Sequence, residues 1–96
     1  MKYRLSAKAD RDILAIFRSS IQMFGLEQAE RYYQGLLAEL SYITEYPEAA
    51  RERTKDGHSR RFHSYGSHVI IYTIRPSDVF VIRVLHGRQD TNRHLP

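Results

Sequence analysis

Several kinds of functional site are missing from this 96-residue sequence, and each absence excludes a class of protein. The chain has no cysteine, which excludes disulfide bonds, thiol nucleophiles and cysteine-based zinc sites. No apolar run approaches the roughly 20 residues of a membrane helix, and no apolar stretch follows the first basic residues as it would in a signal peptide. These absences predict a cytoplasmic protein that does not enter the membrane.

Motifs for nucleotides, cofactors and metals are missing as well. The sequence contains no GxGxxG, GxxxxGK[ST] or GxSxG pattern, which leaves no indication of a nucleotide-binding loop or an α/β-hydrolase nucleophile. The histidines show neither HxH nor HExxH spacing, and His58 and His63 stand five residues apart without a carboxylate-rich pattern around them. We therefore expect no metal ion and no cofactor.

What the sequence does contain is an uneven distribution of charge. Residues 1–50 hold six Lys/Arg and seven Asp/Glu, whereas residues 51–96 hold nine Lys/Arg, four Asp/Glu and all five histidines. The hydrophobic fraction of 42% is ordinary for a globular protein, and a chain of this length supports one core. We expect a single domain over residues 1–96 with one basic face, suited to nucleic acid or an acidic protein surface.

Two amphipathic helices are predicted in the first half, after a short strand at Tyr3–Leu5. Ser6 offers an N-cap, and Gly25 stands where a residue in the left-handed conformation would end the first helix. The first helix has apolar residues at helical spacing: Ala9, Ile13, Ile16, Phe17 and Phe24. The second has an apolar seam that steps by four and three: Ala29, Tyr33, Leu36, Leu40 and Ile43. Pro47 ends it, and the very short linker predicts an antiparallel helical hairpin.

Three strands are predicted in the second half. Residues 48–59 are polar and charged, which indicates an exposed, mobile loop. The strands follow at Arg60–Tyr65, His68–Arg75 and Val79–Leu85. The last two are apolar on both faces, so they are expected at central positions of the sheet.

This order of elements describes an α+β domain. We expect an N-terminal strand, then an antiparallel helical hairpin packed on one face of a small antiparallel β-sheet, and a short C-terminal tail at Thr91–Pro96. One face of the sheet is then covered by helices, and the other must be solvated or bind a partner.

The cations of the second half permit either catalysis or binding. A site that cleaves RNA needs arginine to stabilise charge on phosphorus and histidine to transfer protons, yet no acid–base pair at fixed spacing identifies one. Solvated strand-edge charges that discourage aggregation are the plain alternative. We instead predict a target-binding surface at the exit of the last strand and in the tail. Its residues are Arg61, Arg83, His86, Arg88, Arg93 and His94.

Two further features indicate binding surfaces. Three aromatic residues on the expected strands, Phe62, Tyr65 and Tyr72, are compatible with stacking on nucleobases, which leaves open a non-catalytic nucleic-acid-binding module that uses the sheet face. The apolar stripe of the helices is wider than one contact with the sheet requires. Its excess could form a groove for an amphipathic helix of a partner, or all of it could be core.

Five segments occur in a recognisable order: Tyr3-Arg4-Leu5-Ser6, then Phe24-Gly25 with Gln28-Ala29-Glu30-Arg31-Tyr32, then Tyr46-Pro47, then Gly66-Ser67-His68-Val69-Ile70-Ile71-Tyr72, then Arg83-Val84-Leu85-His86-Gly87-Arg88. In this order and spacing the chain resembles, over nearly its whole length, the ParE-type toxins of the RelE/ParE superfamily. It departs from them where many such chains carry Trp-Gly at Phe24-Gly25 and Gly-Tyr-Arg at Ser59-Arg60-Arg61.

The resemblance implies the toxin component of a type II toxin–antitoxin system, which poisons DNA gyrase without being a nuclease and is neutralised by a ParD-like antitoxin. We expect an acidic, amphipathic segment of that antitoxin to lie across the helices and reach the basic sheet edge. The expected contacts are Ile13, Leu14, Phe17, Ile21, Leu37, Arg61 and Arg83.

The RelE branch of the same superfamily implies an alternative function. Its members cut messenger RNA in the ribosome without a metal, using basic residues and often a C-terminal Tyr or His. In that case the catalytic candidates are Arg61, Arg83, His86 and His94.

Overall fold

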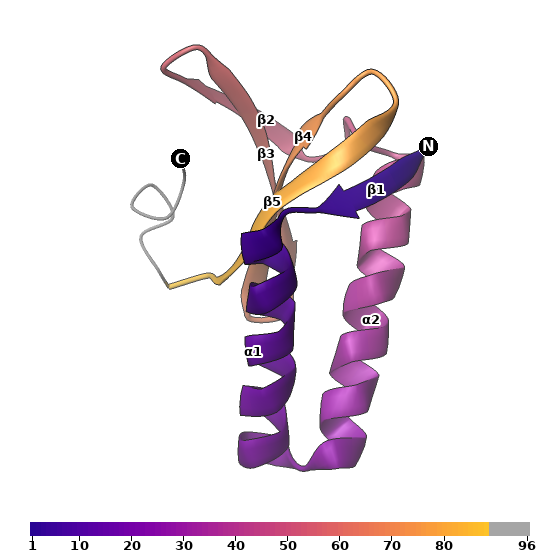
Figure 1. Ribbon diagram of the computed structural model, residues 1–96, viewed down its shortest axis with the longest axis vertical. Coiled ribbons are helices and arrows are strands. Elements are labelled where there is room, and N and C mark those ends of the chain that lie inside the picture. The colour runs from indigo at the N-terminus through magenta and orange to yellow at the C-terminus, as the bar shows by residue number, and fades with distance from the viewer. Residues whose placement is uncertain (89–96) are drawn as a thin grey trace.

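A helical hairpin lies against one face of a five-stranded sheet in the computed structural model, which describes residues 1–88 (Figure 1). In chain order the elements are β1 (Lys2–Leu5), α1 (Ala7–Phe24), α2 (Leu26–Glu45), β2 (Arg51–Lys55), β3 (His58–Tyr65), β4 (His68–Ile74) and β5 (Asp78–His86). The strand order in the sheet is β1-β5-β4-β3-β2. The expected α+β class is confirmed, and so are the inner positions of β4 and β5.

The predicted helix boundaries are confirmed by their caps. The Ser6 hydroxyl accepts a hydrogen bond of 2.9 Å from the backbone N–H of Ala9 and donates one of 2.6 Å to the carbonyl of Ile82, so it starts α1 and ties it to β5. Gly25 has φ of +87° and is the only residue between α1 and α2. A residue with a side chain would be strained at that φ, which explains glycine at this turn.

The sheet is mixed, so the expectation of a purely antiparallel sheet is wrong at one edge. β1 pairs with β5 in parallel, with Tyr3 opposite Val79 and Leu5 opposite Val81. Parallel neighbours require a long crossover connection, and here the helical hairpin and three strands lie between the two in sequence. Because β1 has no short turn to a neighbouring strand, sequence pattern alone did not fix its partner.

The expectation of a mobile loop over residues 48–59 is also wrong. β2 pairs antiparallel with β3, with Arg53 opposite Arg60, and the hairpin reaches away from the helices (Figure 1). Its turn is Asp56-Gly57, where both residues have positive φ, at 53° and 77°. Asp-Gly is a strong signal for a two-residue hairpin turn. The strand was missed because all five residues of β2 are exposed, so no apolar alternation marks it.

The core lies between the helices and the sheet. Leu36, Leu40 and Ile43 of α2 are at most 1% exposed, which confirms the predicted seam of that helix. They cluster with residues of β4 and β5: Ile70, Tyr72, Val79, Val81 and Val84. No helix in the described part of the chain is long and apolar enough to cross a membrane.

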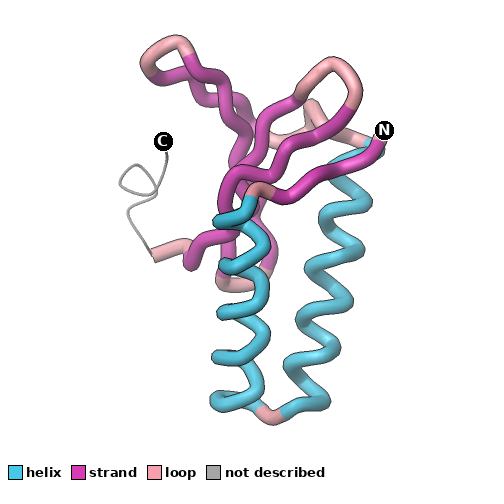
Figure 2. Tube along the Cα trace, viewed as in Figure 1, coloured by secondary structure: helices cyan, strands magenta, loops and turns pink. Residues whose placement is uncertain are grey.

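The two helices run well beyond the strands at their Gly25 end (Figure 2). Met23, Phe24 and Leu26 are therefore exposed there, with no sheet to cover them. Phe24 was expected on the buried stripe of α1. That expectation is wrong because the apolar stripe continues along α1 beyond the part of the helix that the sheet covers.

Candidate functional site

Arg83, predicted as a cation at the strand exit, is held within the fold by Asp12 of α1. Its Nε and Nη2 atoms each donate to a carboxylate oxygen of Asp12 at 2.8 Å, and the same carboxylate accepts the backbone N–H of Val84 at 3.0 Å. Both side chains are 15% exposed, and the hydrogen bonds that Arg83 donates to Asp12 raise the pKa of Arg83 above its ordinary value. Asp12 thus accepts a backbone hydrogen bond from β5 beyond the point where the pairing of β5 with β1 ends.

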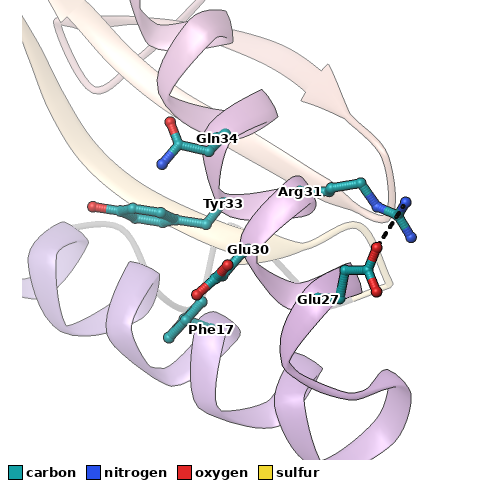
Figure 3. A pocket seen from close by; sticks show the side chains of 6 residues that line it. All are labelled: Phe17, Glu27, Glu30, Arg31, Tyr33 and Gln34. Atoms are coloured by element: carbon teal, nitrogen blue, oxygen red, sulfur yellow. Dashed lines mark ion pairs between the residues drawn. The ribbon is translucent and has the colours of Figure 1, made fainter.

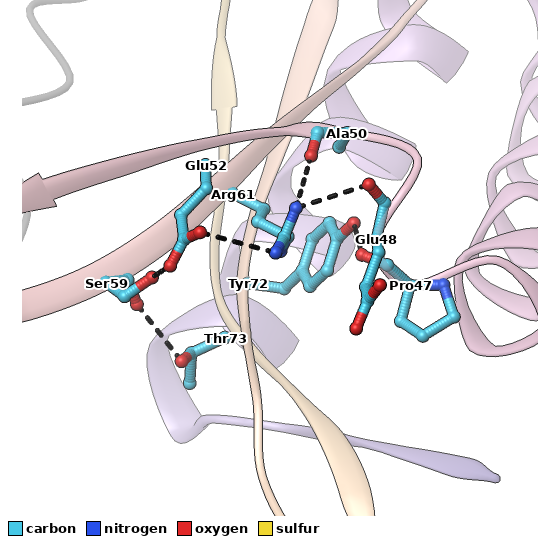
Figure 4. Close-up of polar contacts among 8 residues, drawn as sticks. All are labelled: Pro47, Glu48, Ala50, Glu52, Ser59, Arg61, Tyr72 and Thr73. Atoms are coloured by element: carbon cyan, nitrogen blue, oxygen red, sulfur yellow. Dashed lines mark hydrogen bonds and ion pairs between the residues drawn. The ribbon is translucent and has the colours of Figure 1, made fainter.

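Arg61 also has hydrogen-bond partners within the chain, near the opposite edge of the sheet (Figure 4). Its guanidinium donates to the carbonyls of Ala50 at 2.7 Å and Glu48 at 3.3 Å, and it lies 3.5 Å from a carboxylate oxygen of Glu52. Beside it the Tyr72 hydroxyl donates to the carbonyl of Pro47 at 2.6 Å. Together the two side chains fasten the segment between α2 and β2 to the sheet.

His86 is the last residue of β5, and it is exposed next to His68, a histidine that was not among the predicted site residues. The register places His68 of β4 opposite His86, and their rings are 5.6 Å apart. His68 Nδ1 makes a hydrogen bond of 2.7 Å with the Tyr32 hydroxyl of α2. Burial, and to a lesser degree the charge of His86, lower the pKa of His68.

These residues surround a depression of about 400 Å³ between α1 and the end of β5. Arg83 and His86, both predicted target-binding residues, line it together with His68 and Asp12. Arg61 is not among its lining residues, so the structure separates it from the others. Arg88 follows as an exposed residue beyond Gly87.

Two further predicted target-binding residues, Arg93 and His94, lie outside the described residues. His68 belongs to the Gly-Ser-His segment of the sequence. Its place directly after the turn is the feature from which its contact with His86 could have been predicted. A residue just after a tight turn pairs with the end of the following strand, which brings His68 to His86.

A second depression, of about 680 Å³, lies between the helices (Figure 3). Phe17 of α1 and Tyr33 of α2 form its apolar part, with ring centroids 5.6 Å apart. Glu27, Glu30 and Arg31 lie at its edge, and Arg31 is 3.8 Å from Glu27 in an exposed ion pair. Of the residues predicted to contact an antitoxin, Phe17 alone lines this hollow, and the rim of the hollow is mixed in charge.

The other residues predicted to contact an antitoxin differ in their exposure. Leu14 is 48% exposed, and Ile21 and Leu37 are half-buried. Ile13 is 6% exposed and belongs to the core, so its side chain has little surface to offer a partner. Among the described residues no group of three or more His, Asp or Glu side chains is placed to hold a metal ion.

Comparison with known proteins adds sequence and structural relatives. Residues 3–91 match the family described as ParE toxin of type II toxin-antitoxin system, parDE. The chain is 37% identical to Toxin ParE1 of Caulobacter vibrioides over 95 residues, covering 97% of this chain and 96% of that protein. It is 30% identical to Toxin ParE1 of Mycobacterium tuberculosis over 95 residues, covering 98% and 97%.

The fold also has a solved counterpart. A structure described as a chromosomal ParDE TA system from P. aeruginosa superposes with a TM-score of 0.75, at 17% identity, over 90% of this chain and 95% of that one. At that identity the likeness concerns the fold alone.

Proposed function

The chain belongs to the ParE toxin family of type II toxin–antitoxin systems, and from this membership we propose that it inhibits growth by poisoning DNA gyrase. In this proposal the toxin acts by binding gyrase and breaks no bond itself. The supporting observation is the end of β5, where His86 lines the 400 Å³ depression and Arg88 is exposed two residues further on. Exposed basic residues at the end of a strand suit an anionic protein or protein–DNA surface.

Arg83 has a positioning role in this proposal. Its guanidinium is fixed by Asp12, and that pair holds the end of β5 against α1. A residue engaged in this way orients the neighbouring His86 more than it offers charge to a target. Arg93 and His94 remain predicted contacts.

A ParD-like antitoxin is the proposed partner, bound across the helical hairpin. Leu14 provides exposed apolar surface on α1, and the half-buried Phe17, Ile21 and Leu37 extend it. Apolar anchors of this kind carry most of the affinity in an interface, whereas rim charges mainly raise the association rate. Because Arg61 and Arg83 already have partners within the chain, the apolar contacts are expected to dominate.

A ribosome-dependent ribonuclease is the second candidate, and one observation favours it. Tyr32, His68 and His86 form a chain of contacts in which the pKa of His68 is lowered. A neutral imidazole can accept a proton at physiological pH, which is the step that a general base performs.

Purified gyrase and a translation extract separate the two candidates. The parent toxin is expected to inhibit supercoiling and to leave translation unaffected, and the double variant His86→Gln/Arg88→Gln to lose most of that inhibition. Arg18→Gln, which removes one exposed cation from α1, is the matched control and should behave as the parent. Inhibited translation with untouched supercoiling overturns the proposal, and a roughly 10²–10⁴-fold slower messenger cleavage by His86→Gln would then identify a catalytic histidine.

A further inference from the structure

The β2–β3 hairpin carries a row of cations on one face. Arg51, Arg53 and Lys55 alternate along β2, and alternate residues of a strand point to the same side of the sheet. All three are exposed. The same face of β3 carries Arg60, which the register places directly opposite Arg53.

The register also identifies which face this is. Ile70 and Tyr72 of β4 belong to the core beneath the helices, so Ile71 between them points to the other side. Phe62 of β3 pairs with Ile71, and the Arg53 guanidinium lies 4.5 Å from the centre of the Phe62 ring. The row of cations is therefore on the sheet face that the helices leave uncovered.

Acidic residues of the hairpin do not neutralise the row. Glu52 lies between Arg51 and Arg53 in sequence and so points to the opposite face, where it contacts Arg61 and Ser59. Asp56 lies in the turn. Arg51, Arg53 and Lys55 make no ion pair with any other residue of the described chain.

The arrangement has a cost to folding, although cations on an edge strand such as β2 also discourage aggregation. Like charges directly opposite each other on neighbouring strands are destabilising, yet Arg53 stands opposite Arg60. Cations at alternate positions of a strand are about 7 Å apart, because each residue advances the strand by about 3.4 Å. A regular row of positive charge at that spacing complements a regular row of phosphates.

We propose that the β2–β3 hairpin binds the backbone of duplex DNA, with Arg51, Arg53 and Lys55 contacting its phosphates. A two-stranded β-ribbon fits the dimensions of the major groove. Single strands are bound on exposed aromatic platforms. On this face the rings of Phe62 and Phe80 are covered instead, by the guanidinium groups of Arg53 and Arg75 at 4.5 and 4.4 Å.

This inference does not rest on the proposed target, because DNA binding is measured with the toxin alone. The probe is a fluorescein-labelled 20-base-pair duplex of random sequence, titrated with the full chain and followed by anisotropy at several salt concentrations. Three phosphate contacts predict a slope of about −2.7 in log K against log salt concentration. The variant Arg51→Gln/Arg53→Gln/Lys55→Gln should bind at least about tenfold more weakly, with a slope near zero.

The matched control is Lys8→Gln/Arg11→Gln/Arg18→Gln, which removes three exposed cations from α1 and should keep the parent's affinity and slope. Equal losses in both variants mean that net charge alone attracts DNA, and that result overturns the proposal. So does tighter binding of a single-stranded RNA of the same length, or a hairpin variant that binds as the parent does. If the triple variant unfolds by circular dichroism, Arg53→Gln and Lys55→Gln singly must each reduce the slope by about 0.9.

Discussion

Arginines at different places in this sheet look alike in the sequence and differ entirely in the fold. Toward the helices and the β2 connection, Arg83 and Arg61 are 15% and 17% exposed and hydrogen-bonded to a carboxylate or to carbonyls. On the uncovered face, Arg51 and Arg53 are exposed and have no carboxylate partner among the described residues. The first pair fastens the chain to itself, and the second is left for another molecule. Net charge therefore overstates how much basic surface this protein offers.

The largest effect expected from breaking this contrast is at Asp12. Asp12→Ala removes the carboxylate that binds Arg83 and leaves the Val84 N–H without its acceptor, which should lower the free energy of unfolding by about 2–4 kcal/mol. Urea denaturation measures it. Asp10→Ala, an exposed acid of the same helix, is the control and should cost about 1 kcal/mol or less. Similar losses for both variants would mean that Asp12 contributes only through the helix dipole.

A smaller effect is expected from pH on the covered face, at His68. Because its pKa is lowered in the fold, the unfolded chain takes up the proton first as pH falls. The contribution of His68 is complete above its unfolded pKa of about 6.5 and is lost progressively below it. The facing titratable groups are His86 and Tyr32.

His68→Gln isolates that contribution. Urea unfolding of parent and variant at a series of pH values from 7 to 5 should show a shallower loss of stability in the variant. His58→Gln, on an exposed strand end, is the control and should retain the parent's slope. Parallel curves for parent and His68→Gln would show that folding does not change the pKa of His68.

The smallest effect is expected on the uncovered face. Arg53→Gln removes an exposed cation that faces Arg60 across the strand pair, so stability should change by no more than about 0.5 kcal/mol, and in the direction of a gain. The same urea series measures it. A loss above about 1 kcal/mol would show that the contact of Arg53 with Phe62 outweighs the repulsion.

Helix ends and inner strands could be predicted because single residues or local patterns determine them. Ser6 and Gly25 act at fixed positions relative to a helix end, and β4 and β5 are apolar on both faces because both are inner strands. β2 could not be found from apolar periodicity, since none of its residues is buried. The Asp56-Gly57 turn was the available signal, and it has meaning only when both flanking strands are considered together.

Whether each cation is paired or exposed was harder to predict, because this depends on contacts between residues that are distant in sequence. Nothing local distinguishes Arg83, which meets Asp12 across 71 residues, from Arg88, which stays exposed. His68 gains its neighbours only when β4 and β5 pair in register and α2 brings Tyr32 over them. Residue type identified the candidate residues, whereas tertiary contacts decide which of these side chains are paired within the fold and which are exposed.

The parallel pairing of β1 with β5 also has a consequence for biosynthesis. Ser6 and Asp12 find their partners Ile82 and Arg83 only after the chain that separates them, over 76 and 71 positions, has been translated. Contacts of such long sequence separation slow folding, since the loop between them must close before they form. The helical hairpin can form early, but it waits for the last strand to complete the sheet beneath it. On the ribosome, β1 therefore stays without its partner strand until β5 has been synthesised.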